Sequence, residues 1–586
     1  MRRDAYLAII APCAPHQADP AGAAQLANRA AAEAGFEPLF ESECLTVLAA
    51  PGCRHRSWGT SGIAIGTILS PRTGEDAFDT PPAHDRHLVA GCWGDYVAFL
   101  HDAAKAVTTV VRAPSGGVPA LRTTVDGVTL VSSDPELLLA LARRRPEINW
   151  HFVAHHLAFP HLRPGATGLD GIDELFAGDA TCFGAEGVQR LAVWTPWHFA
   201  SAERQLTDPV QARLAVRQSV ELAVAGLVRG HRSVLLELSG GLDSSVLAAA
   251  LAAAGAPAAA INLVTPGSEG DERAYARATA ERTGLALTEQ AIASDVDLTA
   301  PVPMRTARPG IPAILRPADA LLAGVARERG IAAFVSGTGG DCIFCSPASA
   351  APAADALRAF GFGRRFLRAV RDVSEVHDTN LWTAGLMAWR QAHRPPIHRL
   401  WPGNDAFLAR EALPDEPDPH PWLDEPAGAL PGRRSHIRAV IAAFAHLDGY
   451  ARHAAAPSLF PLLSQPVMEA CFRVPTWLWI AGGRDRAVTR EAFRDALPAR
   501  VLDRRSKGGM DAYCIRNFEA NRARLEPFLL EGHLARAGLL DRPMVETFLR
   551  RPVGPRDQRF YRLLPVIDAE AWVRGWLEPE PAADRR

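Results

Sequence analysis

The chain has 586 residues, of which 48% are apolar, and its formal net charge is −2. This length predicts two or three domains, and the apolar fraction excludes a disordered chain. The near-zero charge argues against a broad basic surface, so we expect no nucleic-acid partner. Nine cysteines scattered along such a chain are typical of a reducing compartment rather than a disulfide framework.

Two apolar stretches need to be distinguished from targeting or membrane segments. The run at residues 5–10 is short and Pro12 follows it closely, which favours a first β-strand over a signal peptide. The alanine-rich stretch at residues 246–264 is interrupted by Gly255 and Pro257, so it predicts a buried helix followed by a strand. We therefore expect a cytoplasmic protein with no membrane partner.

Short apolar runs separated by glycine and proline predict a β-rich domain over residues 1–205. The runs that predict strands are residues 62–69, 87–100, 107–112 and 127–132. From residue 206 the pattern changes, and residues 208–229 predict a capped amphipathic helix. Strand-like runs at residues 234–238, 259–264 and 332–335 then alternate with helical stretches, which predicts a parallel sheet. Beyond about residue 350 the pattern is mostly helical.

The most informative segment is residues 234–245, Val-Leu-Leu-Glu-Leu-Ser-Gly-Gly-Leu-Asp-Ser-Ser. A strand, a glycine turn and a helix N-terminus in this order form a geometry that binds phosphate. Glycine lets the backbone approach an anion, serine adds a hydroxyl donor, and aspartate can hold magnesium. The residues in these three roles are Gly240 and Gly241; Ser239, Ser244 and Ser245; and Asp243. The alternative is a strand–helix turn that binds no ligand.

Two later loops support nucleotide chemistry. Residues 265–268, Thr-Pro-Gly-Ser, follow the second predicted strand, and residues 336–341, Ser-Gly-Thr-Gly-Gly-Asp, follow the third. Because the carboxyl ends of parallel strands meet at one edge of the sheet, we expect both loops to face the same nucleotide. The second loop could place Asp341 opposite Asp243, and such a carboxylate pair suits magnesium.

A third segment, residues 504–509, contains one of only two lysines in the chain. Nearly all of the 63 basic residues are arginine, so a retained lysine is a candidate for a chemical role. Lys507 stands in the turn Arg-Arg-Ser-Lys-Gly-Gly. The alternative is a solvated basic turn.

Together these motifs resemble the asparagine-synthetase superfamily along nearly the whole chain. The family's pyrophosphate loop, Leu-Pro-Gly-Ser segment, Ser-Gly-Glu-Gly-Ser-Asp segment and Arg-x-Lys turn match residues 239–244, 265–268, 336–341 and 505–507. The resemblance implies an α/β fold with an Ntn-hydrolase-like, glutaminase-like β-rich sandwich over residues 1–205. It implies a PP-loop ATP pyrophosphatase domain with a helical extension over residues 206–586.

The resemblance also implies ATP and Mg²⁺ as cofactors. Asp243 and Asp341 would hold the metal, and Lys507 would stabilise the negative charge that builds during adenylation and acyl transfer. Adenine and ribose would lie against Leu238, Leu263, Ser336 and Gly337, and the phosphates against Ser239, Gly240, Gly241 and Ser244.

Two departures from the family redirect the expected function. Arg2 stands where glutamine-dependent members carry a nucleophilic cysteine, and the nearest cysteine is Cys13. We therefore expect no glutaminase activity and a first domain that is structural or a docking surface. Thr338 stands where asparagine synthetase has a glutamate, so the group that handles the acceptor must also differ.

Within the superfamily the chain is most similar to the lasso-peptide cyclases, which are macrolactam synthetases. Residues 337–345 resemble their second loop, residues 461–467 resemble their substrate-side segment, and residues 483–486 would precede a helix that faces the nucleotide or the peptide. This implies an AMP-forming ligase that adenylates an Asp or Glu side chain of a precursor peptide and closes a macrolactam with the peptide's N-terminal amine. The implied partners are the precursor peptide and the leader-peptide protease and leader-binding protein of the same pathway.

Other interpretations stay open. One is a small-molecule lactam synthetase or an ammonia-dependent asparagine synthetase, and another is a non-catalytic scaffold that binds a peptide or nucleotide. The base that deprotonates the acceptor amine is not assigned, although Glu375 and His377 are candidates. Cys342 and Cys345 have zinc-like spacing, but no second pair follows, so we expect two packed thiols.

Overall fold

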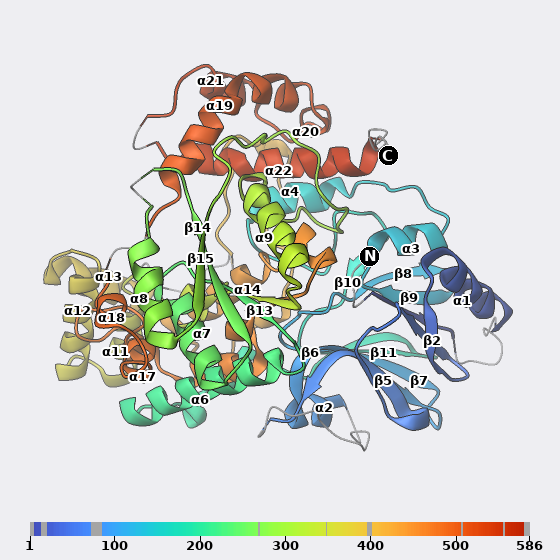
Figure 1. The fold of residues 1–586 in the computed structure, drawn as a ribbon, viewed down its shortest axis with the longest axis horizontal. Helices are drawn as coiled ribbons and strands as arrows, with labels where there is room; N and C mark the ends of the chain where they lie inside the picture. Colours follow the sequence, from blue (N-terminus) through green and yellow to red (C-terminus); the bar gives the residue numbers. More distant parts are fainter. Residues whose placement is uncertain are drawn as a thin grey trace.

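The computed structural model describes residues 5–12, 20–71, 85–267, 270–346, 349–394, 401–505, 508–554 and 557–578. Figure 1 shows the sheets of the N-terminal part on one side of the molecule. Helices α11, α12 and α13 lie at the opposite edge, and α19 to α22 lie along a third side.

The N-terminal part contains two six-stranded antiparallel sheets, with the orders β10-β8-β9-β1-β3-β2 and β12-β11-β7-β6-β5-β4. The strands are β1 (Tyr6–Ile10), β2 (Glu37–Glu41), β3 (Leu45–Ala49), β4 (His55–Ser57), β5 (Gly62–Leu69), β6 (Trp93–Asp102), β7 (Val107–Arg112), β8 (Leu121–Val125), β9 (Val128–Ser132), β10 (Asp173–Glu174), β11 (Asp179–Gly184) and β12 (Gly187–Ala192). Tyr6 and Ala8 of one sheet are buried in one cluster with Val97 and Phe99 of the other. The two sheets therefore face each other across a shared core.

Most of the strands predicted here are confirmed, with one error. The runs at residues 62–69, 107–112 and 127–132 form β5, β7 and β9, the last beginning one residue late. The single strand predicted over residues 87–100 is wrong in its first part, because Asp85–Gly91 forms helix α2. Leu88 and Val89 are buried by that helical turn, and a short apolar run does not distinguish a buried turn from a strand.

The second part of the chain is built on a five-stranded parallel sheet of order β15-β14-β13-β16-β17. Its strands are β13 (Val234–Glu237), β14 (Ala258–Val264), β15 (Ala286–Ala291), β16 (Ala333–Val335) and β17 (Ser458–Leu459). The three predicted strands are confirmed within one residue at each end. The chain runs outward from β13 through β14 to β15 and returns to β16 on the other side of β13. This reversal creates a switch point between β13 and β16, where α/β sheets bind ligands.

The helix predicted at residues 208–229 is α6 (Pro209–Val228), and the side chain of Asp208 accepts N–H groups of Val210 and Gln211 as its cap. The other α-helices are α1 (Pro20–Ala34), α2 (Asp85–Gly91), α3 (Pro135–Leu141), α4 (Trp150–Ala158), α5 (Pro196–Ala200), α7 (Leu242–Ala253), α8 (Arg273–Thr283), α9 (Arg316–Arg329), α10 (Gly340–Ile343), α11 (Ala351–Phe360), α12 (Arg364–Val376), α13 (Leu381–His393), α14 (Pro431–Phe444), α15 (Gln465–Arg473), α16 (Thr476–Trp479), α17 (Ala487–Ala492), α18 (Ala499–Leu502), α19 (Asp511–Leu530), α20 (His533–Arg536), α21 (Arg542–Leu549) and α22 (Phe560–Leu577). Within the described ranges, no helix combines the length and the apolar character needed to cross a membrane.

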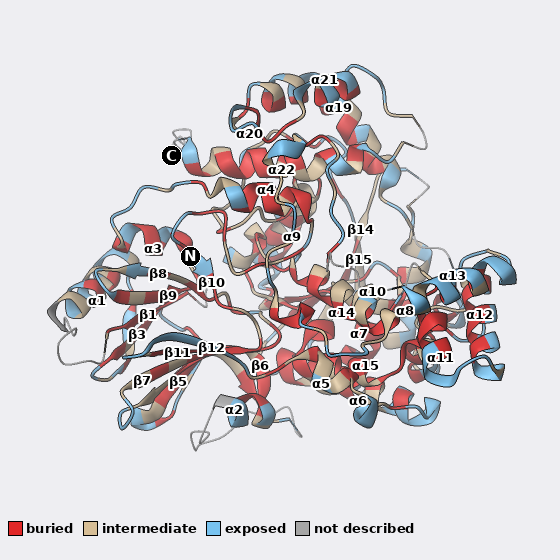
Figure 2. Ribbon diagram, turned by 180° about the vertical axis from the view of Figure 1, so that it is seen from behind, coloured by how far each residue is buried: buried red, intermediate tan, exposed pale blue. Residues whose placement is uncertain are grey.

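The two parts of the chain share a hydrophobic core. Leu7 and Phe152 belong to the same buried cluster as Trp572 of α22. A Cβ at Gly168 would lie 2.3 Å from the Trp572 ring, so only glycine fits beneath it. Figure 2 shows the buried residues of α4 and α22 where these helices lie together. This core contains residues of both parts, so it does not mark a boundary between two domains. The predicted domain boundary at residue 205 stays a prediction.

Candidate active site

The predicted pyrophosphate loop connects β13 to α7. Gly240 adopts a φ of 82°, and a Cβ there would lie 2.7 Å from the backbone nitrogen of Ala276. Ser239 Oγ accepts a hydrogen bond from the N–H of Gly241 at 3.2 Å and lies 3.1 Å from Ser244 Oγ. The turn therefore places two hydroxyls beside the N-terminus of α7, a helix of 12 residues whose first N–H groups favour an anion.

The loop after β16 packs directly on the pyrophosphate loop. A Cβ at Gly340 would lie 2.4 Å from the Cβ and Cγ of Asp243, and a Cβ at Gly337 would lie 3.2 Å from the backbone nitrogen of Ser244. Gly339, between them, has a φ of 84°. The run of glycines thus permits a contact between the two loops that larger residues would prevent.

Asp243 and Asp341 converge on one cation position. Nη1 of Arg486 lies 3.2 Å from Asp243 Oδ2 and also donates to Asp341 Oδ1. Nε of the same guanidinium donates to Asp485 Oδ2 at 2.7 Å. Burial alone would lower the pKa of Arg486, but the carboxylates of Asp243, Asp485 and Asp341 outweigh burial and raise that pKa. Nη1 of Arg486 therefore occupies a position where Asp243 and Asp341, the two predicted metal ligands, both stabilise a positive charge.

This donor set fits a magnesium ion. Mg²⁺ prefers carboxylate oxygens and keeps positions for water and substrate phosphates, so two protein carboxylates suffice. In the described part of the chain, no group of three or more His, Cys, Asp or Glu side chains could hold a metal ion. The assignment of Mg²⁺ to Asp243 and Asp341 agrees with the geometry and stays a prediction.

A cavity of about 780 Å³ opens over these loops. The predicted site residues that line it are Ser239, Gly241, Asp243, Ser244, Ser336, Gly337 and Asp341. Other parts of the lining are residues 375–378, His446, residues 483–486, Arg490, Arg504 and Arg505. The lining therefore includes both candidate bases, Glu375 and His377. Loops from distant parts of the chain thus enclose one space beside the cation position.

Some predicted site residues do not line this cavity. Leu238 is buried, and its carbonyl accepts a hydrogen bond from Asn262 Nδ2 at 2.8 Å. Leu263 packs against the hydrophobic cores, and Gly240 lies against α8. Predictions that concern Arg2, Cys13, Ser268 and Lys507 fall on residues outside the described ranges.

Arg504 and Gly508, which flank two residues outside the described ranges, both contact Glu272, which stands just before α8. Nη2 of Arg504 pairs with Glu272 Oε1 at 2.7 Å, and the guanidinium lies 4.1 Å from the centre of the Tyr275 ring. The N–H of Gly508 donates to the same Glu272 oxygen at 3.0 Å. Nη1 of Arg504 also reaches the carbonyl of Gly240 at 3.5 Å, which ties this segment to the pyrophosphate loop.

The sequence model of the asparagine synthase family matches residues 215–574, more than half of the chain. The chain belongs to the asparagine synthase family. Membership supports an ATP-dependent ligase that forms an amide bond. A search of curated proteins found no match to the chain.

Two solved structures have weak similarity to this asparagine synthase family member. One is described as the allosteric regulatory enzyme of purine biosynthesis, with 9% identity, a TM-score of 0.19, and coverage of 51% of this chain and 76% of that chain. The other is the glutamine phosphoribosylpyrophosphate amidotransferase from B. subtilis complexed with ADP and GMP, with 10% identity, a TM-score of 0.18, and coverage of 60% and 71%. At these TM-scores neither supports a conclusion about fold, so the Ntn-hydrolase-like assignment stays a prediction.

The main feature that sequence reasoning missed is the role of Arg486. Residues 483–486 do precede a helix, α17, and do line the cavity, as expected. The bridge from Arg486 to two carboxylates was not anticipated, because nothing separates it from the many other arginines of the sequence. Arg490 holds Asp485, the third carboxylate that contacts Arg486, since Arg490 Nη2 pairs with Asp485 Oδ1 at 2.8 Å. Burial alone would raise the pKa of Asp485, but Arg486 and Arg490 lower it.

Two smaller expectations have different outcomes. Residues 461–467 do not line the cavity of about 780 Å³. Leu462 and Val467 are fully buried, and a Cβ at Gly339 would lie 2.6 Å from the side chain of Leu463. This segment therefore packs against the second loop, and its similarity to a substrate-side segment stays a prediction. Cys345 is buried, and burial raises the pKa of its thiol to about 12, which suits a packed thiol.

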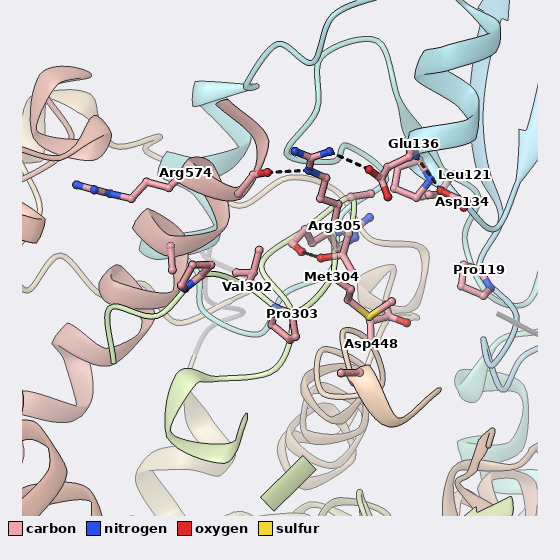
Figure 3. Close-up of a pocket in the computed structure, with 18 of the residues that line it drawn as sticks. Pro119, Leu121, Asp134, Glu136, Val302, Pro303, Met304, Arg305, Asp448 and Arg574 are labelled. Carbon is pink, nitrogen blue, oxygen red and sulfur yellow. Dashed lines mark hydrogen bonds and ion pairs between the residues drawn. The ribbon is translucent and has the colours of Figure 1, made fainter. Parts of the chain in front are cut away.

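A second cavity, of about 670 Å³, lies between the two parts of the chain (Figure 3). Nη1 of Arg305 donates to Glu136 Oε1 at 3.1 Å, and its Nε donates to the carbonyl of Gly575 at 2.8 Å. Glu174 also lines this cavity and pairs with three arginines, namely Arg112, Arg163 and Arg308. Burial alone would raise the pKa of Glu174, but the arginines hold it well below its usual range. These groups are paired with one another, and the cavity shares no residue with the predicted nucleotide site.

Proposed function

We propose that this protein is an ATP-dependent macrolactam synthetase that acts on a precursor peptide, as in lasso-peptide cyclisation. Family membership supports ATP-dependent amide formation. The observation that carries the proposal is the convergence of Asp243 and Asp341 on one cation position beside the pyrophosphate loop. The similarity of residues 337–345 to the cyclases supports a peptide as the substrate.

The reaction has two steps. In the first, a side-chain carboxylate oxygen of the peptide attacks the α-phosphorus of ATP and the bond to the bridging oxygen breaks, which gives an acyl-adenylate and pyrophosphate. In the second, the peptide's N-terminal amine attacks the acyl carbon, the bond to AMP breaks, and the amine loses a proton to a base. The products are the macrolactam, AMP, pyrophosphate and a proton.

The chain's own groups would stabilise the charge that builds in the first step. The N–H groups at the start of α7 and the hydroxyls of Ser239 and Ser244 would bind the leaving pyrophosphate. Mg²⁺ held by Asp243 and Asp341 would neutralise phosphate charge. The guanidinium of Arg486 occupies the same position, so it would have to move away from Asp243 and Asp341 when the ion binds.

The second step depends on positioning, because the amine must meet an activated carboxyl of the same peptide. The part of the cavity that residues 375–378 line would hold the peptide, and Glu375 and His377 stand there as candidate bases. The leader-peptide protease and the leader-binding protein are proposed partners, since removal of a leader exposes the amine that closes the ring.

ATP–pyrophosphate exchange with the full chain tests the proposal, with a precursor peptide encoded by a neighbouring gene as substrate. We expect exchange that depends on the peptide, and a product that has lost one molecule of water by mass spectrometry. Exchange with aspartate or a small β-amino acid in place of the peptide would support the other synthetase reactions. No exchange, and no effect of Asp243→Ala on any activity, would support a scaffold.

A further inference from the structure

The hairpin formed by α12 and α13 carries an unusual amount of exposed apolar surface. Fourteen large apolar side chains are exposed in the described part of the chain, and eight of them lie between residues 360 and 389. The most exposed are Trp382, at 89%, Phe362, at 76%, and Leu367, at 63%. A concentration of exposed apolar side chains marks a surface that binds a protein, a membrane or a ligand.

Helix α13 has its small residues inside and its large residues outside. Ala384 and Ala388 are buried against the rest of the hairpin. Trp382, Leu386 and Trp389 follow one another at intervals of four and three residues, which places them in one stripe on the opposite face. All three are exposed, so this face lacks a partner among the described residues.

Arginines outnumber acidic residues on the hairpin. Residues 361–394 hold six arginines and three acidic residues, Asp372, Glu375 and Asp378, and no acidic residue occurs at residues 361–371 or 379–394. Arg364, Arg365, Arg368 and Arg390 are exposed. These four form no ion pair within the ranges that the structure covers. In a chain with a net charge of −2, this is a local excess of positive charge.

The hairpin lies at the edge of the molecule in both views (Figures 1 and 2). Its outer surface is coloured largely as exposed in Figure 2. The C-terminal end of α12 and the following turn, residues 375–378, line the cavity of about 780 Å³. A partner seated on the hairpin would therefore lie close to the proposed active site.

We propose that the α12–α13 hairpin binds the surface of a membrane that contains anionic phospholipid. Tryptophan and leucine side chains are stabilised in the interfacial region of a bilayer, and arginines are attracted to anionic headgroups. A second copy of the chain would bring the same arginines together, which disfavours a dimer through this face. Such binding would be association with the membrane surface without a span, in contrast to the expectation of no membrane partner. The inference does not depend on the proposed reaction.

Vesicle co-sedimentation with the full chain tests this proposal. Vesicles of pure phosphatidylcholine are compared with vesicles in which about a third of the lipid is phosphatidylglycerol. We expect binding to the anionic vesicles alone, with weaker binding at high salt because the charges are screened. R364Q/R368Q is expected to weaken binding about 25-fold, since each arginine near an anionic surface contributes about 5-fold, or ~1 kcal/mol.

The variant W382S/L386S removes the apolar contribution and is expected to weaken binding by at least ~10-fold. Its matched control is V210S/L214S on α6, where two exposed apolar residues also stand four apart. The control V210S/L214S should bind vesicles as the native chain does. W382S/L386S and V210S/L214S should both keep the native melting temperature, because the four replaced side chains are exposed. Absence of binding to anionic vesicles, or equal binding by the hairpin variants, would overturn the proposal. A dimer that W382S/L386S dissociates, without vesicle binding, would also overturn it.

Discussion

Gly340→Ala tests whether the two glycine loops must touch for the site to work. The added Cβ would lie 2.4 Å from the Cβ and Cγ of Asp243. Non-bonded carbon atoms prefer separations of about 3.5–4.0 Å, so the loops would have to part by roughly 1 Å. A displacement of about 1 Å at reacting groups can reduce a rate by about 10²-fold. We therefore expect ATP–pyrophosphate exchange by G340A to fall by about two orders of magnitude.

The assay compares exchange rates for the native chain, G340A and the control Gly324→Ala. Gly324 lies inside α9, and a Cβ there meets nothing within 4 Å. G324A should keep native exchange and gain about 1 kcal/mol of stability from helix propensity. Overpacking by G340A should reduce stability by about 1–3 kcal/mol, which a melting curve measures separately. If folded G340A exchanges pyrophosphate within about threefold of the native rate, close contact between the two loops is not needed for exchange.

Three further predictions concern other parts of the molecule. Arg486→Gln removes the guanidinium from the cation position, so about 10 mM Mg²⁺ should stabilise R486Q by roughly 1 kcal/mol more than the native chain in a melting experiment; equal shifts would argue against a shared position. Burial raises the pKa of Asp179 to about 7, so its charged form destabilises the native state above neutral pH, and stability rises as the pH falls from 7 toward 4. Asp179→Asn should therefore stabilise the protein at pH ~8 by up to about 4 kcal/mol in denaturant titrations, with a gain that vanishes near pH ~4; a gain independent of pH would contradict this. Gly168→Ala would place a Cβ 2.3 Å from the Trp572 ring and should lower stability by about 1–3 kcal/mol while exchange by the folded protein stays native, and unchanged stability would show that the shared core adapts.

Local patterns in the sequence were sufficient to predict the central sheet. The strands before both glycine loops were placed within one residue because apolar runs end there at glycine or serine. Asp208 marked the start of α6 because its side chain caps the helix. The helix α2 was mistaken for a strand because two buried residues in a single turn carry no periodicity.

For the site, the sequence could predict the residues that lie within the loop motifs. It could not predict contacts that join distant elements of the chain. Asp243 and Asp341 could be paired because both follow strands whose carboxyl ends meet at one edge of a parallel sheet. The structure adds that these strands, β13 and β16, are neighbours. Arg486 was not assigned, because its contacts with both carboxylates depend on the path of the chain between distant elements. The exposed stripe on α13 was also missed, since Trp382, Leu386 and Trp389 at helical spacing look like a buried face until the neighbouring elements are known.

We propose that Asp243 and Asp341 form a magnesium-dependent site that activates a carboxylate with ATP. ATP–pyrophosphate exchange in the presence of the precursor peptide and Mg²⁺ tests this most directly, for Asp243→Asn, Asp341→Asn and the exposed control Asp126→Asn. We expect a loss of at least ~10²-fold for the first two variants and a native rate for D126N. Native exchange rates in both D243N and D341N, with melting temperatures unchanged, would contradict it.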